Sequence, residues 1–290
     1  MTVRRTPGLA VAALVAVAGC HRPPAPDRAA DAPATAASVE PVVAEAGAST
    51  PTERPSSEAP VAIGGTQLLV ATGRIHDPDA PAVEEAMRAA YARMRADEDD
   101  AASPLRVRTP PLAPDLLVYE PTLPGTTAVV FLHGYGGRFA LPCWQVAHAV
   151  ATLGVTTACP SIGTEGDWWT DAGQRVVRAT VDALRAAGAQ RVILVGLSNG
   201  GIGASRLAAR MKGTFAGLAL VSGADPAAAS PGVPVLVVQG RRDAMSSAAG
   251  ARMYAKRTGG RYVELDAGHF ALLLRADDAE RAIRDFVASL

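Results

Sequence analysis

Short apolar segments alternate with helical segments from residue 116 to the C-terminus, and this alternation restricts the possible folds more than any other feature. Strands are expected at 116–119, 128–132, 155–159, 192–195, 217–221, 235–239 and 261–264, and helices at 143–153, 174–187, 198–211, 247–258 and 277–290. Strands that are apolar on both faces and alternate with helices form a parallel sheet that is covered on both sides. The sequence therefore predicts an α/β fold with a mostly parallel, doubly covered sheet.

The chain of 290 residues is long enough for one sizeable domain with additional segments, and 49% hydrophobic residues can bury a substantial core. Its formal net charge is zero. Because neither basic nor acidic residues are in excess, nothing in the composition indicates a nucleic acid partner.

The N-terminus has the pattern of an export signal. Arg4 and Arg5 precede an apolar run at 9–18, and small residues lead to Cys20. The run is too short to span a bilayer. Its ending resembles the bacterial lipoprotein signal, which implies removal of residues 1–19 and lipidation of Cys20. In families with this signal, a residue other than aspartate after the cysteine, here His21, directs the protein to the outer membrane. An ordinary signal or a buried segment that carries a cysteine is the alternative.

Three segments follow the predicted signal. Residues 20–62 are dominated by Pro, Ala, Ser, Thr and Glu, which predicts a flexible tether behind the lipidated cysteine. Residues 63–290 are predicted to form the folded domain, in which 63–114 is an N-terminal extension and 115–290 is the catalytic core. Within the extension we expect a strand at 67–71 and a helix at 81–95, with one apolar face formed by Val83, Met87, Ala90, Tyr91 and Met94. The extension either lengthens the sheet or shields a pocket.

A candidate nucleophile lies in the segment 191–201. This segment contains a buried strand, the pattern Gly-x-Ser-x-Gly around Ser198, and the small-residue start of a helix. A serine on such a sharp strand-to-helix turn has its hydroxyl exposed at the end of the sheet. The two glycines avoid collisions with the neighbouring strand and helix.

Two further candidates follow later strands. Asp243 follows the strand at 235–239, and His269 follows the strand at 261–264. A histidine can accept the serine proton, and a carboxylate on the far side of its ring can fix the tautomer and stabilise the imidazolium. Asp225, which follows the strand at 217–221, is the alternative acid.

A glycine-rich loop precedes these residues. The strand at 128–132 runs into His133-Gly134-Tyr135-Gly136-Gly137. Backbone N–H groups must point at the oxyanion that develops during acyl transfer. We expect one of these groups from Asn199 and the other from Tyr135.

Together these motifs resemble those of the α/β-hydrolases, over about residues 115–290. The resemblance implies an esterase-like or lipase-like enzyme with Ser198 as nucleophile, His269 as base and Asp243 as orienting acid. The expected reaction is cleavage of a small-molecule or lipid ester through an acyl-enzyme, at the cell envelope, with the membrane contacted through the lipid anchor. Two alternatives remain: a hydrolase of another acyl bond (a peptidase, thioesterase or polyester depolymerase), or a non-catalytic lipoprotein that uses the fold for binding.

The substrate pocket is expected to be open. Only residues 222–234 separate the strands between which many lipases and epoxide hydrolases insert a helical cap, so no large cap is predicted. The loop at 160–173 should overhang the site, which makes Trp168 and Trp169 candidate substrate-binding residues. Phe139, like Tyr135, is a further candidate.

Cys143 and Cys159 form an even pair in a chain with an export signal, which favours a disulfide, although both also suit buried free thiols. The histidines are scattered, and no pair of Cys or His residues has metal-ligand spacing. The glycine-rich stretches lack a dinucleotide fingerprint. We therefore expect no metal and no cofactor.

Overall fold

The computed structural model describes residues 54–108 and 116–290. The predicted signal segment, the lipidation site at Cys20 and most of the predicted tether therefore lie outside the described residues. Of the described helices, none is both long enough and apolar enough to cross a membrane.

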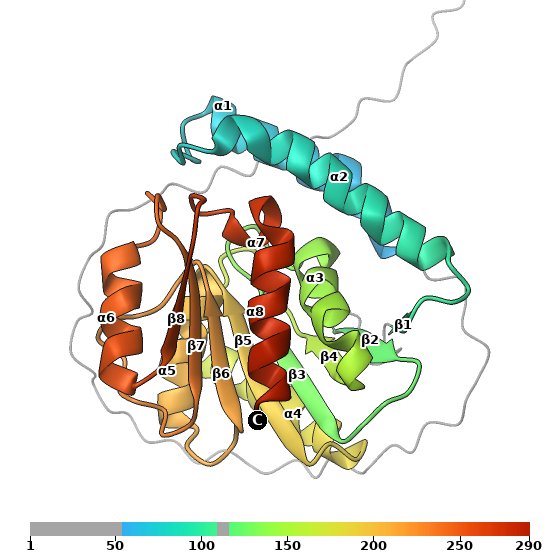
Figure 1. The fold of residues 1–290 in the computed structure, drawn as a ribbon, viewed down its shortest axis with the longest axis vertical. Helices are drawn as coiled ribbons and strands as arrows, with labels where there is room; N and C mark the ends of the chain where they lie inside the picture. Colours follow the sequence, from blue (N-terminus) through green and yellow to red (C-terminus); the bar gives the residue numbers. More distant parts are fainter. Residues whose placement is uncertain (1–53, 109–115) are drawn as a thin grey trace, which may run out of the picture. The chain divides into compact units, whose positions relative to one another are not determined.

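The described strands form one mixed sheet with the order β1-β2-β4-β3-β5-β6-β7-β8 (Figure 1). Their bounds are β1 Leu105–Arg108, β2 Leu117–Pro121, β3 Thr127–Leu132, β4 Thr156–Cys159, β5 Arg191–Leu197, β6 Gly217–Val221, β7 Val235–Gly240 and β8 Arg261–Leu265. The strands from β3 to β8 pair in parallel, whereas β2 is antiparallel to both β1 and β4. The predicted α/β class and mostly parallel sheet are confirmed, and the short edge strand β1 was not predicted.

Helices cover both faces of this sheet because alternate residues of each strand point to opposite sides. In β5, Ile193 and Val195 join one apolar cluster, and Val192 and Leu194 join the other. The first cluster is covered by α3 (Ala140–Val150) and α8 (Ala276–Ala288), and the second by α4 (Asp171–Ala186), α5 (Asn199–Arg210) and α6 (Ala248–Thr258). No helix lies within residues 222–234, between β6 and β7, so the prediction that this cap is absent is confirmed.

Cys143 and Cys159 are joined by a disulfide with a Cα–Cα distance of 6.3 Å. Cys143 lies on α3 and Cys159 is the last residue of β4. Both are buried. The bond therefore ties the helix to the carboxyl end of the neighbouring strand, which is the end at which the candidate active site lies.

The N-terminal extension is helical and contains no strand before β1. It comprises a short 3-10 helix η1 (Pro55–Glu58), α1 (Ala59–Ala71) and α2 (Ala80–Asp99). The predicted strand at 67–71 is wrong, because these residues form the last turn of α1. A short apolar run fits a helix and a strand equally well when its periodicity is weak. The predicted end of the tether at residue 62 is also wrong, since residues 55–62 are helical.

The helix predicted at 81–95 is confirmed as part of α2. Its buried residues are those expected from the apolar periodicity: Val83, Met87, Ala90, Tyr91 and Met94. They belong to the same apolar cluster as α3 and the short helix α7 (Ala271–Leu274). The extension is therefore packed into the main core, and its strand β1 also lengthens the sheet by pairing with β2.

One carboxylate also joins the extension to the core. Oε1 of Glu58 accepts hydrogen bonds from the backbone N–H of Ala140 (2.7 Å) and of Leu141 (3.2 Å) and from the hydroxyl of Tyr91 (2.7 Å). It thus satisfies donors at the N-terminus of α3 that have no partner within that helix. Burial nevertheless raises the pKa of Glu58 above its ordinary value.

Candidate active site

Ser198 occupies the turn between β5 and α5 in a strained backbone conformation, with φ 55° and ψ −119°. Residues other than glycine rarely adopt a positive φ, and such strain persists only where the surroundings enforce it. Here the Ser198 N–H donates to Val221 O (2.9 Å), and its carbonyl accepts from Ile202 (3.0 Å). A side chain at Gly200 would overlap the carbonyl of Leu132, so the start of α5 can approach β3 only with glycine there.

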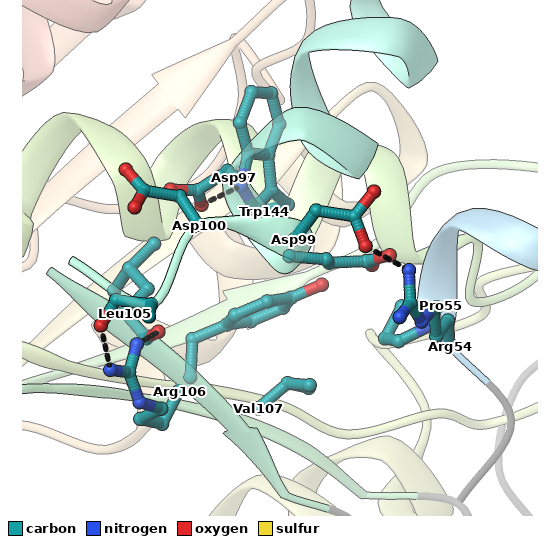
Figure 2. Close-up of a pocket in the computed structure, with 12 residues that line it drawn as sticks. Arg54, Pro55, Asp97, Asp99, Asp100, Leu105, Arg106, Val107 and Trp144 are labelled. Carbon is teal, nitrogen blue, oxygen red and sulfur yellow. Dashed lines mark hydrogen bonds and ion pairs between the residues drawn. The ribbon is translucent and has the colours of Figure 1, made fainter. Parts of the chain in front are cut away.

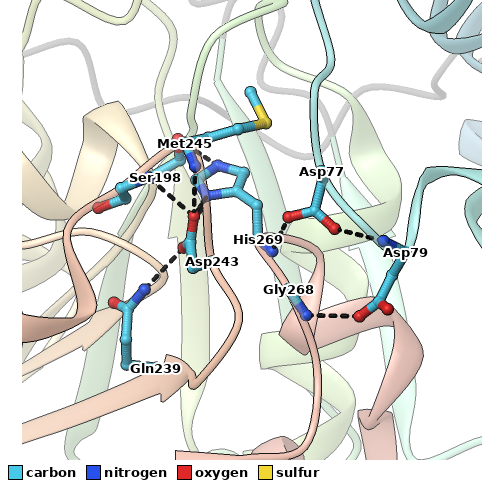
Figure 3. Close-up of polar contacts among 9 residues, drawn as sticks. Asp77, Asp79, Ser198, Gln239, Asp243, Met245, Gly268 and His269 are labelled. Carbon is cyan, nitrogen blue, oxygen red and sulfur yellow. Dashed lines mark hydrogen bonds and ion pairs between the residues drawn. The ribbon is translucent and has the colours of Figure 1, made fainter.

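The strained turn brings Ser198 to His269. Oγ of Ser198 lies 2.9 Å from Nε2 of His269, and Nδ1 of His269 lies 2.9 Å from Oδ2 of Asp243 (Figure 3). A carboxylate only accepts hydrogen bonds, so Nδ1 carries the ring proton and Nε2 is free to accept the serine proton. The three candidate residues thus form one hydrogen-bonded chain across the carboxyl ends of the sheet.

Asp243 accepts hydrogen bonds from three further donors besides the histidine ring. Its Oδ1 accepts from the backbone N–H of Met245 (2.9 Å) and Ser246 (2.7 Å), and its Oδ2 accepts from Nε2 of Gln239 (2.6 Å). The side chain is fully buried. These fixed donors set the plane of the carboxylate and therefore the plane of the His269 ring.

The alternative acid, Asp225, is not in contact with the histidine ring. Its Oδ2 accepts a hydrogen bond of 2.6 Å from Nε of Arg206 on α5. Between the two acids that the sequence leaves open, the structure places Asp243 against His269 and Asp225 in an ion pair elsewhere.

The predicted oxyanion loop lies against the serine. A Cβ atom on Gly134 would lie 3.0 Å from Cβ and 3.6 Å from Oγ of Ser198. The loop is fixed by the N–H of Gly136, which donates to Thr164 O (2.8 Å). At the first position of α5, the N–H of Asn199 has no acceptor four residues earlier within its helix. The Tyr135 N–H donates to no backbone carbonyl of the described residues. The assignment of these two N–H groups to the oxyanion hole stays a prediction.

His133, the first residue of this loop, is buried and has a supporting role. Its Nδ1 donates to Gly134 O (2.8 Å), and the ring packs edge-on against Trp168 with a centroid distance of 5.0 Å. Burial lowers the pKa of His133, which favours the neutral ring. His133 therefore shapes the loop and does not compete with His269 for Ser198.

The substrate-binding prediction for Trp168 is wrong. Its side chain is fully buried in the core, and its Nε1 donates to His133 O (2.9 Å). Trp169 is half-buried, and its ring faces the guanidinium of Arg206 at 5.4 Å, two helical turns from Ser198. The pair of tryptophans anchors the loop at 160–173, and the structure does not place either ring at the nucleophile.

Two other aromatic residues lie near the oxyanion loop. Phe139 is half-buried and packs against the core, and its ring would lie 3.6 Å from a Cβ atom on Gly136. Tyr135 is 47% exposed and directly follows Gly134, which contacts Ser198. Of the aromatic residues singled out in the sequence, these two lie in or next to the loop beside Ser198, and their contact with a substrate stays a prediction.

Three polar residues of the site were not predicted: Gln239, Asp77 and Asp79. A glutamine in the apolar strand β7 is a usable signal, because a buried polar side chain needs a partner. Asp77 and Asp79 contact the loop before His269 from the distant N-terminal extension (Figure 3). Nothing in their local sequence indicates that contact.

A cavity of about 460 Å³ lies elsewhere, between the C-terminal end of α2 and β1 (Figure 2). Its lining includes Trp144, whose Nε1 donates to Asp97 (2.8 Å), and also Arg54 and Arg106. None of Ser198, Asp243 and His269 lines it. In the part of the chain that the structure describes, no group of three or more His, Cys, Asp or Glu side chains is arranged to hold a metal ion.

Comparison with solved structures identifies the architecture. An α/β serine hydrolase without a lid from Xanthomonas campestris aligns with 20% identity and a TM-score of 0.50, over 64% of this chain and 93% of that one. An esterase from Pyrococcus furiosus aligns with 15% identity and a TM-score of 0.51, over 60% and 87%. An α/β-hydrolase enzyme from the metagenome of lagoon sediments at Mar Chica, Morocco, aligns with 14% identity and a TM-score of 0.52, over 63% and 98%. No protein-family model and no curated protein matches the sequence. The eight-stranded, mostly parallel sheet with helices on both faces therefore has the α/β-hydrolase fold.

Proposed function

We propose that this protein is a serine hydrolase that cleaves carboxylic esters through an acyl-enzyme on Ser198. The observation that carries the proposal is the hydrogen-bonded chain Ser198–His269–Asp243, with 2.9 Å at each of its two contacts. A serine hydroxyl is a weak nucleophile unless a base accepts its proton, and this chain supplies both the base and the group that orients it.

In the first half of the reaction, Oγ of Ser198 attacks the acyl carbon while its proton passes to Nε2 of His269. The negative charge that develops on the carbonyl oxygen is stabilised by the N–H groups of Asn199 and Tyr135. His269 then gives its proton to the alcohol oxygen as the ester bond breaks. Throughout this step the carboxylate of Asp243 stabilises the imidazolium.

In the second half, His269 removes a proton from a water molecule that attacks the acyl-enzyme. The acid product leaves when the proton returns to Oγ of Ser198. Every catalytic group in both steps belongs to this chain, one water molecule is consumed, and the enzyme's protons return to their starting positions at the end of the cycle.

One observation supports an ester substrate over other acyl compounds. A structural neighbour described as an esterase shares this fold, as does one described as a serine hydrolase without a lid.

A fluorophosphonate probe tests the proposal because it reacts with activated serines. The parent protein should be labelled, and Ser198→Ala should not. Ser222→Ala is a control: Ser222 also directly follows a strand and has a positive φ of 49°, but it is buried and has no hydrogen bond to His269. Turnover of matched ester, thioester and anilide substrates then separates an esterase from a thioesterase or peptidase. A folded parent protein that is not labelled would refute the proposal.

We also propose that the enzyme is anchored to the bacterial cell envelope, on the outer membrane, through a lipid on Cys20. The proposal is supported by the sequence pattern at residues 4–21. Mass spectrometry of the protein from bacterial membranes should find a lipidated N-terminal cysteine. Cys20→Ser should move the protein to the soluble fraction, and equal membrane association of the variant and the parent would contradict the anchor.

A further inference from the structure

The segment between α1 and α2 reaches the loop that carries His269. Oδ2 of Asp77 accepts the backbone N–H of His269, and Oδ2 of Asp79 accepts the backbone N–H of Gly268 at 2.5 Å (Figure 3). The partners are about 190 positions apart in the chain. Two carboxylates of the N-terminal extension thus bind consecutive amides next to the candidate base.

The contact is built into both partners. Asp77 is buried, with 6% of its surface exposed, and its Oδ1 accepts the N–H of Asp79 at 2.9 Å. A Cβ atom on Gly268 would overlap the carboxylate of Asp77, so only glycine at this position lets the loop approach. The carboxylate of Asp77 is thus held by the turn that leads to Asp79, and the glycine at position 268 leaves room for it.

Asp79 also reaches the loop that carries the triad acid. Both of its oxygens lie 3.1 Å from NH2 of Arg242, the residue before Asp243. The backbone N–H of Arg242 in turn donates to Ala267 O (3.0 Å). Asp79 therefore connects the loop of the acid with the loop of the histidine.

We propose that Asp77 and Asp79, here called the aspartate clamp, are positioning residues that hold His269 in line with Ser198 and Asp243. On this proposal, which rests on the proposed function, the N-terminal extension completes the active site of the α/β core. Charge-assisted hydrogen bonds to backbone N–H groups are among the stronger ones, and loss of a partner leaves a buried donor unsatisfied. Small displacements of a catalytic group lower the rate of the chemical step.

Alanine and asparagine variants test the clamp. Asp77→Ala should lower kcat about tenfold with KM unchanged, since one such hydrogen bond corresponds to roughly a factor of ten. Asp77→Asn should recover most of the rate because its amide oxygen can still accept the His269 N–H. Asp79→Ala should behave like Asp77→Ala, and the double variant should lose more than either. Asp100→Ala is the control, because Asp100 also accepts a backbone N–H, that of Ala102, but lies at the far end of α2.

Hydrogen exchange of the backbone N–H groups of Gly268 and His269 gives a second readout that does not depend on activity. Exchange should be faster in Asp77→Ala and Asp79→Ala and unchanged in Asp100→Ala. If the parent is labelled by the fluorophosphonate and a folded double variant is labelled at the same rate, the clamp is refuted and the proposed function stands. If the parent is not labelled, the proposed function fails. The exchange rates then decide the clamp alone: faster exchange supports it, and unchanged exchange overturns it.

Discussion

Replacement of Asp243 by asparagine tests the carboxylate most directly, because the structure specifies how the new amide will sit. Oδ1 of Asp243 accepts from two backbone donors, the N–H groups of Met245 and Ser246. Since these donors cannot move, the amide oxygen will stay there and the NH2 group will replace Oδ2. Gln239 can then turn its own amide, because its Oε1 has no hydrogen-bond partner among the described residues and can accept from the new NH2 group. The variant should therefore fold.

The new NH2 group would donate to Nδ1 of His269 and force the ring proton onto Nε2. Nε2 could then no longer accept the proton of Ser198. The variant also loses the attraction between the carboxylate and the imidazolium, which is ~4 kcal/mol for charges about 4 Å apart at an effective dielectric constant of about 20. That corresponds to about 10³-fold in rate. With the wrong tautomer added, we expect Asp243→Asn to lower kcat by about 10³–10⁴-fold.

The assay is steady-state hydrolysis of a short-chain ester, with the free energy of unfolding measured in urea for each variant. Asp225→Asn is the matched control, since it removes a carboxylate from the end of the adjacent strand β6 and weakens only the pair with Arg206. It should keep kcat within about threefold, because Asp225 contacts neither Ser198 nor His269 and its asparagine oxygen can still accept from Arg206. The reasoning is refuted if folded Asp243→Asn retains a tenth of the parent rate, or if Asp225→Asn loses as much.

Three further predictions concern groups around the site. Trp168→Phe removes the donor to His133 O and leaves that buried carbonyl unsatisfied, so the free energy of unfolding in urea should fall by about 1–3 kcal/mol, and an unchanged value would contradict the contact. Burial raises the pKa of Glu58 above its ordinary 4.5, so the contribution of Glu58 to the free energy of unfolding is fully present below pH 4.5 and is lost as the pH rises through its raised pKa in the folded state. Glu58→Gln should flatten that part of the pH–stability curve, and a curve of unchanged slope would refute this assignment. Cys143→Ala with Cys159→Ala opens a loop of 16 positions and should lower stability by about 3 kcal/mol; equal urea midpoints for the oxidised parent and the variant would oppose this.

The arrangement of Ser198, Asp243 and His269 could be predicted because each follows a strand of a parallel sheet. The carboxyl ends of such strands meet at one edge, so residues that are 71 and 26 positions apart become neighbours once the strand order is assumed. The apolar pattern was enough to predict these strands and α2, because their apolar residues follow a clear pattern. The positions of the three residues in the chain, each after the end of a strand, were thus enough to predict that they lie together, without knowledge of any contact.

The failures have local physical causes. The apolar run at 67–71 lacks a periodicity that distinguishes helix from strand. It continues α1, whose earlier residues Ala62 and Ile63 belong to the same apolar cluster as α2. Trp168 was assigned to the pocket because loops over active sites are exposed. Its ring instead fills the core and its N–H satisfies His133 O, which are the two requirements of a buried tryptophan.

The aspartate clamp could not be predicted, because its position depends on a packing surface and not on strand order. His269 is followed by α7, whose Ala271 and Leu272 are buried in the same apolar cluster as Met87 and Val83 of α2. The packing of α2 on α7 brings the start of α2, and with it Asp79, beside the loop before α7. Hydrophobic packing is not directional, so the apolar faces alone fix only approximately how α2 is placed against α7. The hydrogen bonds from Gly268 and His269 to the two carboxylates then set the exact register, and a helix that merely covered the core would have no need of them.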